Sequence, residues 1–172
     1  MIGIAIIALG CGKRGGESTT ASTPADVLPT ALAAVFAEVS SETALRPIPE
    51  LRRTAKPGDE IVFEAKVMGT EKPFVDNRAL FVVGDDGTLT SCDQRHADEC
   101  ATPWDNCCDD PDDLRAGTAT IQVVDTDGNI LHHGIKGIFG LKELSRLRIA
   151  GVVAPNSTET ALIINASRIQ VL

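Results

Sequence analysis

Short stretches of alternating apolar and polar residues constrain the C-terminal two thirds of this chain most strongly. After the turn at residues 57–59, Ile61, Phe63, Ala65 and Val67 alternate with polar neighbours. A period of two puts every second side chain on one face, as in a strand with one buried face. Further stretches with strand character lie at 78–83, 118–124, 146–153 and 161–172. The pattern predicts an all-β domain with minor helix and five to six strands.

A closed barrel is the simplest way for such short strands to hide their edges. Residues 58–67 (GDEIVFEAKV) resemble the opening strand of an OB-fold, and 147–153 followed by 162–169 resemble its closing hairpin. This resemblance covers residues 58–172 and implies a small OB-like barrel. The residue pattern of the last strand predicts an irregularity near Asn165. It implies a fold rather than an activity. A small β-sandwich is the alternative architecture.

The first residues resemble a targeting signal. An apolar run from Ile2 to Leu9 ends in small residues before Cys11, as a secretory signal does. With Cys at this position, residues 1–11 resemble a bacterial lipoprotein signal. The resemblance implies that Cys11 is lipidated and that the mature chain is anchored to the membrane in the bacterial cell envelope, on the extracytoplasmic side. A buried N-terminal strand is the alternative interpretation.

Between this signal and the barrel, the composition changes twice. Residues 12–24 are rich in Gly, Ser and Thr, which is typical of a flexible tether. Residues 25–57 form an extension that we expect to be partly helical. Apolar spacing over 25–39 predicts one helix, and 48–53 predicts another short helical turn between prolines.

A cysteine-rich insertion, which we call the cysteine loop (residues 85–117), separates the second and third predicted strands. Apart from Cys11, it holds all the cysteines: Cys92, Cys100, Cys107 and Cys108. An even number of cysteines in an exported chain predicts disulfides. A bond between the adjacent Cys107 and Cys108 would be strained, so Cys92 and Cys100 should each pair with one member of the doublet. Two pairings remain open.

The alternative for these cysteines is a metal site. The four thiolates of Cys92, Cys100, Cys107 and Cys108, with His96 as a substitute ligand, could hold zinc or copper. The spacing lacks the close Cys pairs of structural zinc sites. It also lacks the Cys-x-x-Cys of redox proteins.

The cysteine loop is strongly acidic. Ten acidic residues lie between Asp85 and Asp113, with Arg95 as the one base among them. Clustered charge of this sign could hold Ca²⁺ or attract an envelope protein or another cationic ligand. The predicted contact residues are Trp104, Asp105, Asp109 and Asp110.

We expect the Trp104 ring to pack on a disulfide inside the cysteine loop. Trp104 also belongs to the short motif Pro-Trp-Asp-x-Cys-Cys at residues 103–108. This motif resembles a loop of uncharacterised bacterial lipoproteins with OB-like domains. That resemblance implies no activity.

The remaining features narrow the function. With 24 acidic against 16 basic residues, the chain has a net charge of −8, which opposes nucleic-acid binding. Its expected basic patch is modest: Lys66, Arg78, Arg146 and Arg148. No catalytic motif occurs and no cofactor is predicted, with zinc or calcium as alternatives. We therefore predict a non-enzymatic, lipid-anchored binding module of the cell envelope. The alternatives are a thiolate metal-binding protein and a nucleic-acid-binding OB-fold.

Overall fold

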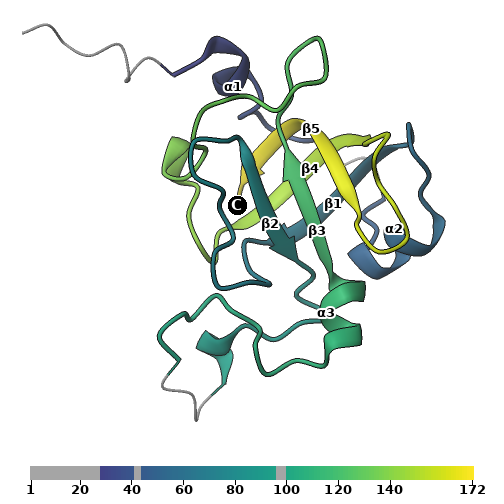
Figure 1. Ribbon diagram of the computed structural model, residues 1–172, viewed down its shortest axis with the longest axis vertical. Coiled ribbons are helices and arrows are strands. Elements are labelled where there is room, and N and C mark those ends of the chain that lie inside the picture. Colours follow the sequence, from purple (N-terminus) through teal and green to yellow (C-terminus); the bar gives the residue numbers. More distant parts are fainter. Residues whose placement is uncertain (1–27, 41–43, 96–99) are drawn as a thin grey trace, which may run out of the picture.

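The computed structural model describes residues 28–40, 44–95 and 100–172. Its five strands are β1 (Glu60–Lys66), β2 (Leu80–Gly84), β3 (Thr118–Gln122), β4 (Arg146–Val153) and β5 (Ile163–Val171). Its helices are short: α1 (Thr30–Ala34), α2 (Ile48–Thr54) and α3 (Pro111–Gly117), with the 3₁₀ turns η2 (Cys92–Gln94) and η3 (Ile138–Gly140). The predicted all-β class with minor helix is confirmed (Figure 1).

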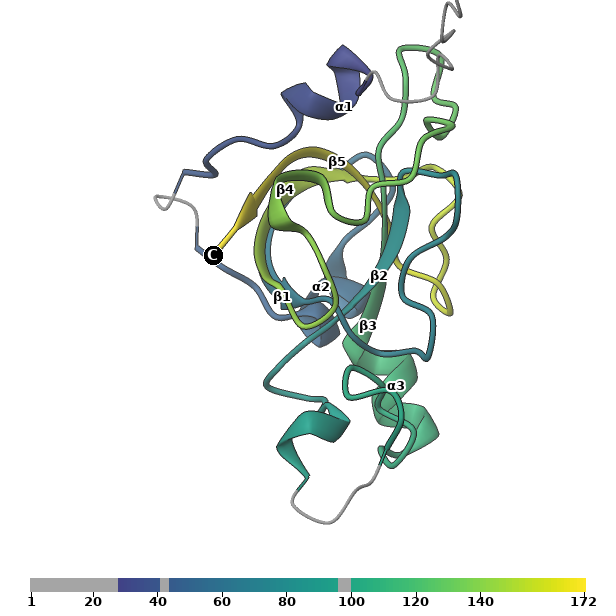
Figure 2. The ribbon, with the colours of Figure 1, turned by 90° about the vertical axis from the view of Figure 1, so that its left-hand side faces the viewer.

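The five strands close into a barrel in the order β1-β2-β3-β5-β4, with β1 pairing to both β2 and β4. All neighbours are antiparallel except β3 and β5, which run parallel. Such a five-stranded barrel is OB-like. It forms instead of the alternative β-sandwich. Figure 2 shows the strands curving around a common interior.

The interior is filled by the residues that the alternation assigned to it. Phe63, Phe81, Ile121, Leu147 and Ile149 have no exposed surface. On β1, β3 and β4 the polar neighbours face outward, so the period of two predicted the buried face correctly there. Phe81 lies on β2, whose sequence LFVVG is apolar on both faces.

The last strand carries the predicted irregularity. Ala150 pairs with Arg168 but the next residue, Gly151, pairs with Ala166, so Ser167 is an extra residue on β5. This is a β-bulge, close to the position expected near Asn165. A Cβ on Gly151 would lie 2.5 Å from the Asn165 carbonyl oxygen, so only glycine allows the two strands to approach this closely.

The N-terminal helix is shorter than predicted, and its expected extent over 25–39 is wrong. Residues 25–27 lie outside the described chain, and the helix spans only Thr30–Ala34. Beyond it, Phe36 forms a parallel bridge with Ile169 of β5, and the Val39 amide donates to the Gln170 side chain at 3.1 Å. Residues 36–39 therefore pair with β5 instead of continuing the helix that their apolar spacing predicted.

The second predicted helical turn is confirmed as α2, which contacts α3 and β3. Its buried residues Ile48 and Leu51 belong to the barrel core. Asp85, just after β2, accepts the Ile48 amide at 3.0 Å. This carboxylate therefore joins the start of α2 to the start of the cysteine loop.

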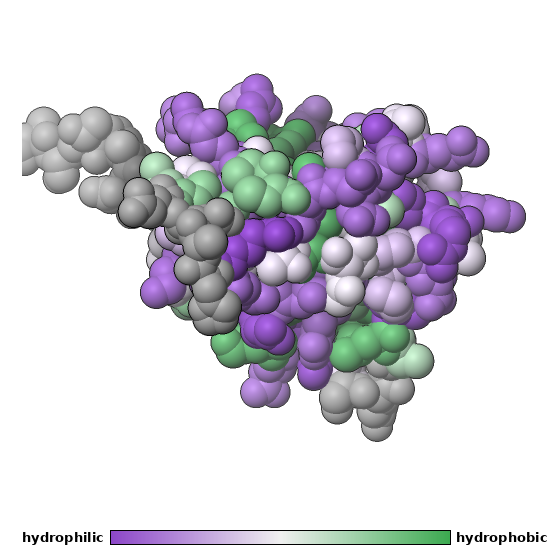
Figure 3. All heavy atoms as spheres, turned by 90° about the horizontal axis from the view of Figure 1, so that it is seen from below, coloured by the Kyte–Doolittle hydropathy of each residue, from purple (hydrophilic) through white to green (hydrophobic). Residues whose placement is uncertain are grey.

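The two ends of the molecule differ in character. In Figures 1 and 2, α1 lies at one end of the barrel, and the cysteine loop with α3 lies at the other. Seen from the loop end, the surface is mostly hydrophilic, and its hydrophobic side chains form separate small patches (Figure 3). Among the described helices, none has the length and apolar character to cross a bilayer. Cys11 and the tether at 12–24 lie outside the described residues.

Candidate metal centre in the cysteine loop

The cysteine loop is fixed to the barrel by a small apolar contact at its base. Leu89 is buried, and its side chain lies so close to Gly84 and Gly117 that a Cβ on either glycine would come within about 3 Å of it. Met68, also fully buried, lies equally close to Gly84. The loop therefore leaves and re-enters the barrel around one leucine side chain.

Two backbone hydrogen bonds then fold the loop back on itself. The Cys92 amide donates to the Asp105 carbonyl, and the Asp93 amide donates to the Pro103 carbonyl, both at 2.9 Å. This pairing lays the segment around Cys92 beside the segment that leads to Cys107. It is the reason that cysteines distant in sequence come together.

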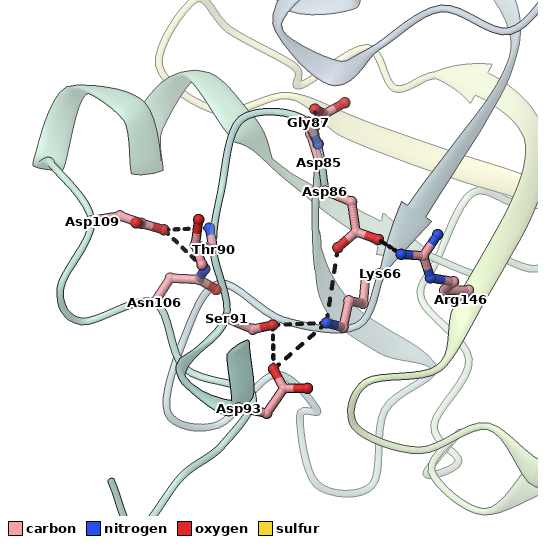
Figure 4. A network of polar contacts seen from close by, with 10 residues as sticks. All are labelled: Lys66, Asp85, Asp86, Gly87, Thr90, Ser91, Asp93, Asn106, Asp109 and Arg146. Atoms are coloured by element: carbon pink, nitrogen blue, oxygen red, sulfur yellow. Dashed lines mark hydrogen bonds and ion pairs between the residues drawn. The ribbon is translucent and has the colours of Figure 1, made fainter. Parts of the chain in front are cut away.

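A carboxylate whose side chain is only 10% exposed supports the same fold. Asp109 accepts hydrogen bonds from the Thr90 amide at 2.9 Å and from the Asn106 side chain at 3.0 Å (Figure 4). It also pairs with Arg95. Asn106 is itself fully buried. These contacts fix the backbone on both sides of Cys107.

Lys66, the last residue of β1, ties the loop to the barrel from the other side. Its side chain is only 6% exposed, and its Nζ donates to Ser91 Oγ at 2.7 Å. The carboxylates of Asp86 and Asp93 lie 3.9 and 3.7 Å from the same nitrogen, and Asp86 also pairs with Arg146 (Figure 4). Lys66 thus balances part of the loop's negative charge.

This network corrects the expected basic patch. Lys66 is buried, Arg146 is paired with Asp86, and Arg148 is paired with Glu64 at 2.7 Å. Of the aromatic side chains on the expected binding strands, Phe63 and Phe81 are fully buried and Phe74 is partly buried. Three of the four expected cations are therefore paired with carboxylates, which weakens the basic patch that a nucleic-acid groove needs, and the fourth, Arg78, is exposed.

Three thiols meet in the middle of the loop. The sulfurs of Cys92, Cys100 and Cys107 all lie within 4.8 Å of one another, and Cys92 and Cys107 are 3.8 Å apart. Cys108 lies 3.9 Å from Cys107 but does not belong to the group of three. The structure contains no disulfide bond between any of these four cysteines.

The thiols have different surroundings. Cys92 is only 3% exposed, Cys100 is intermediate, and Cys107 and Cys108 are exposed. Burial, with the neighbouring sulfurs, raises the pKa of Cys92 to about 12. Hydrogen bonds with the Thr102 hydroxyl and carbonyl, at 3.5 and 3.6 Å, lower the pKa of Cys100.

These distances suit a shared metal ion. Metal–sulfur bonds of about 2.3 Å place two ligand sulfurs about 3.8 Å apart in a tetrahedral site, and the Cys92–Cys107 distance is 3.8 Å. Within residues 28–40, 44–95 and 100–172, no other group of three or more His, Cys, Asp or Glu side chains lies closely enough to share an ion. A calcium site of carboxylates is thus unsupported there. His96, the predicted substitute ligand, lies outside the described residues.

The predicted contact residues serve mainly the loop's own structure. Trp104 is half-buried, and its indole N–H donates to the Glu71 carbonyl at 2.8 Å, so it packs toward the β1–β2 connection. Asp105 accepts the Asn106 amide, and Asp110 caps α3 by accepting the Asp112 amide. Their role in binding stays a prediction, as does that of Asp109.

Sequence reasoning missed Lys66, which was assigned to a surface patch. Two features of the sequence could have indicated it: Lys66 directly precedes the apolar pair Val67-Met68, and the loop after the next strand has a large excess of acidic residues. The alternation of apolar and polar residues alone could not identify it, because an exposed lysine at the same position would give the same pattern.

Taken together, the fold and the site define a small OB-like barrel with a thiol cluster in the insertion between β2 and β3. No family model, curated protein or solved structure matches the chain.

Proposed function

We propose that this protein is a metal-binding module in which Cys92, Cys100 and Cys107 hold one thiophilic metal ion. The observation that carries the proposal is the placement of three sulfurs within 4.8 Å of one another. Thiolates select soft or borderline ions such as Cu(I) and Zn(II).

The surrounding structure favours an ion over a charged partner at this loop. Several of the acids that could attract a basic partner already face cations of the chain: Asp86 and Asp93 face Lys66, and Asp109 faces Arg95. The thiols, by contrast, contact mainly one another. The groups of this loop that could bind a metal ion are therefore mainly the cysteine sulfurs.

Disulfide formation is the competing fate of the same atoms. The Cys92–Cys107 distance of 3.8 Å is well beyond a covalent S–S bond of about 2.05 Å, but only a small displacement separates the two arrangements. Two crosslinks among the four cysteines, as the sequence predicts, would leave no thiolate for a metal. Counting thiols and bound metal in one sample distinguishes the two.

The location is also proposed, on the sequence of residues 1–24 alone. A lipid on Cys11, followed by a tether, would attach to the described domain through its N-terminal end. Because α1 and the cysteine loop lie at opposite ends of the barrel (Figure 1), the metal site would point away from the anchored end. We infer a metal-binding module held at the extracytoplasmic side of a bacterial membrane.

The test of metal binding uses the full chain with the C11S substitution, which removes the one cysteine outside the loop. The protein is purified without oxygen, and metal content and free thiols are measured together. We expect one equivalent of zinc or copper, with three thiols that react only after the metal is removed and one, that of the exposed Cys108, that reacts without its removal. C107S should lose the metal, whereas C108S, its neighbour outside the group of three, should retain it.

Absence of free thiols in protein taken directly from the envelope would support the disulfide framework and contradict the metal proposal. Localisation is tested separately by the intact mass of protein from the envelope fraction. A mass that includes acyl chains on a chain starting at Cys11 supports the anchor, and an unmodified chain in the cytosol contradicts it.

A further inference from the structure

The proposed metal site can be specified further from the number, exposure and order of its sulfurs. Among the described residues, the donor set consists of three thiolates, with no carboxylate or imidazole in the same group. Zinc sites in proteins are almost always four-coordinate. Three thiolates in a plane, with bonds of roughly 2.3 Å, would place sulfurs about 4.0 Å apart, which the observed separations also accommodate.

The three sulfurs differ in depth, and this gives the site a direction. Cys92 is almost fully buried and lies at the bottom, Cys100 is intermediate, and Cys107 is exposed. Cys108 follows Cys107 in the chain, is also exposed, and has its sulfur 3.9 Å from that of Cys107. A bound ion would thus have sulfur below it and a second exposed thiol beside its solvent-facing ligand.

Resting on the proposed function, we infer that the ion is monovalent copper, held by Cys92, Cys100 and Cys107, and that it leaves to a thiol acceptor through Cys107 and Cys108. Monovalent copper is soft and prefers sulfur, and it is stable with three ligands. An open side then permits an incoming sulfur to bind before an outgoing one departs.

The exchange balances without an oxidant. At each step one copper–sulfur bond forms with an incoming thiol, that of Cys108 or of the acceptor, and one bond to a cysteine of the chain breaks. The proton of the incoming thiol passes to the released cysteine sulfur, and the steps repeat until only acceptor sulfurs hold the ion. The copper stays monovalent throughout. Cys108 acts as a stepping ligand, because its sulfur can bind the ion while Cys107 still holds it.

The affinity test uses the C11S chain under nitrogen, with bathocuproine disulfonate competing for Cu(I) and pyridylazoresorcinol competing for Zn(II). We expect tighter binding of Cu(I), one ion per chain, and three sulfur neighbours in X-ray absorption. C100S and C107S should each weaken Cu(I) binding at least tenfold, while C108S stays within about twofold. Cys92 is buried, so C92S is interpreted only if its circular dichroism matches the parent chain.

Preferential Zn(II) binding with four ligands would overturn this inference and leave the proposed metal function intact. Loss of that fourth ligand in H96A would identify its source. Binding of neither ion by a fully reduced, folded chain would overturn both. The exit route is tested by the rate of copper transfer to glutathione: C108S should slow it severalfold at unchanged affinity, and an unchanged rate would refute the role of Cys108.

Discussion

Replacement of Lys66 by methionine should measure how much the barrel contributes to holding the cysteine loop. Methionine has a similar length, so little cavity is created and the loss is mainly electrostatic. The change removes the 2.7 Å hydrogen bond to Ser91 and the positive charge between Asp86 and Asp93. It leaves two carboxylates near each other without their cation.

The magnitude follows from the exposure of the partners. A charge-assisted hydrogen bond contributes on the order of 1.5–3 kcal/mol, and breaking a fully buried ion pair costs about 3–5 kcal/mol. Asp86 and Asp93 are 27% and 35% exposed, so water partly replaces the ammonium, and Arg146 still pairs with Asp86. We therefore expect K66M to lower the free energy of unfolding by about 2 kcal/mol.

Urea denaturation followed by circular dichroism measures this difference, with R148M as the matched control. Arg148 of β4 also forms an ion pair, with Glu64 on the neighbouring strand β1, but Glu64 is 41% exposed. An exposed ion pair contributes less than about 1 kcal/mol to stability. K66M should in addition speed proteolytic cleavage within the cysteine loop. A loss in K66M no greater than in R148M would refute the assignment of Lys66 as the buried cation that organises the loop.

Three further predictions address the barrel, its pH dependence and the metal site. G151A should lower the free energy of unfolding by roughly 2–3 kcal/mol through overpacking at the bulge. In the control G134A the new Cβ would lie 3.9 Å from its nearest neighbour, so the free energy of unfolding should change by less than about 0.5 kcal/mol. Equal effects of the two substitutions in urea titrations would contradict the steric argument. Hydrogen bonds from its own turn, that of the Asn129 amide first, lower the pKa of Asp125 from its ordinary value. The stability that the ionised carboxylate contributes is present above the ordinary carboxyl pKa and is lost as pH falls through the lowered one. D125N should therefore lose less stability than the parent chain on acidification, as measured by thermal unfolding. Saturating metal at 100 times its dissociation constant should stabilise the folded chain by about 2.7 kcal/mol, a shift in Tm that C107S abolishes and C108S retains; an equal shift in both variants would place the ion elsewhere.

The barrel was predictable because its information is local. β1, β3 and β4 are marked by alternation over a few residues, and β2 by a short apolar run. Gly151 allows the close approach at the bulge in the irregular last strand. The N-terminal helix was mispredicted because its residues satisfy two patterns at once. Phe36 and Val39 have helical spacing, but they meet β5, which lies far along the chain and leaves no mark on the local sequence.

The site was predictable only in part, for a different reason. The sequence identified the four cysteines and their two possible chemistries, but the loop has little apolar content and thus no periodic signal. Its fold depends on single polar contacts between distant residues, such as Thr90 with Asp109 and Lys66 with Ser91. Contacts of this kind are specified by three-dimensional position, so the sequence alone could not select which three sulfurs converge.

The same sparse anchoring has a consequence for the choice between metal and disulfide. Leu89 and Lys66 hold the base of the loop to the barrel, and the cysteines lie further out, where few apolar contacts restrain the chain. A crosslink of either kind would restrict the loop there. The two kinds exclude each other, because a Cys92–Cys107 bond would consume two of the three sulfurs that the ion needs. The redox conditions under which the chain encounters the metal ion therefore decide which crosslink forms. A disulfide would give the loop a structural role, whereas reduced cysteines would let it hold an ion.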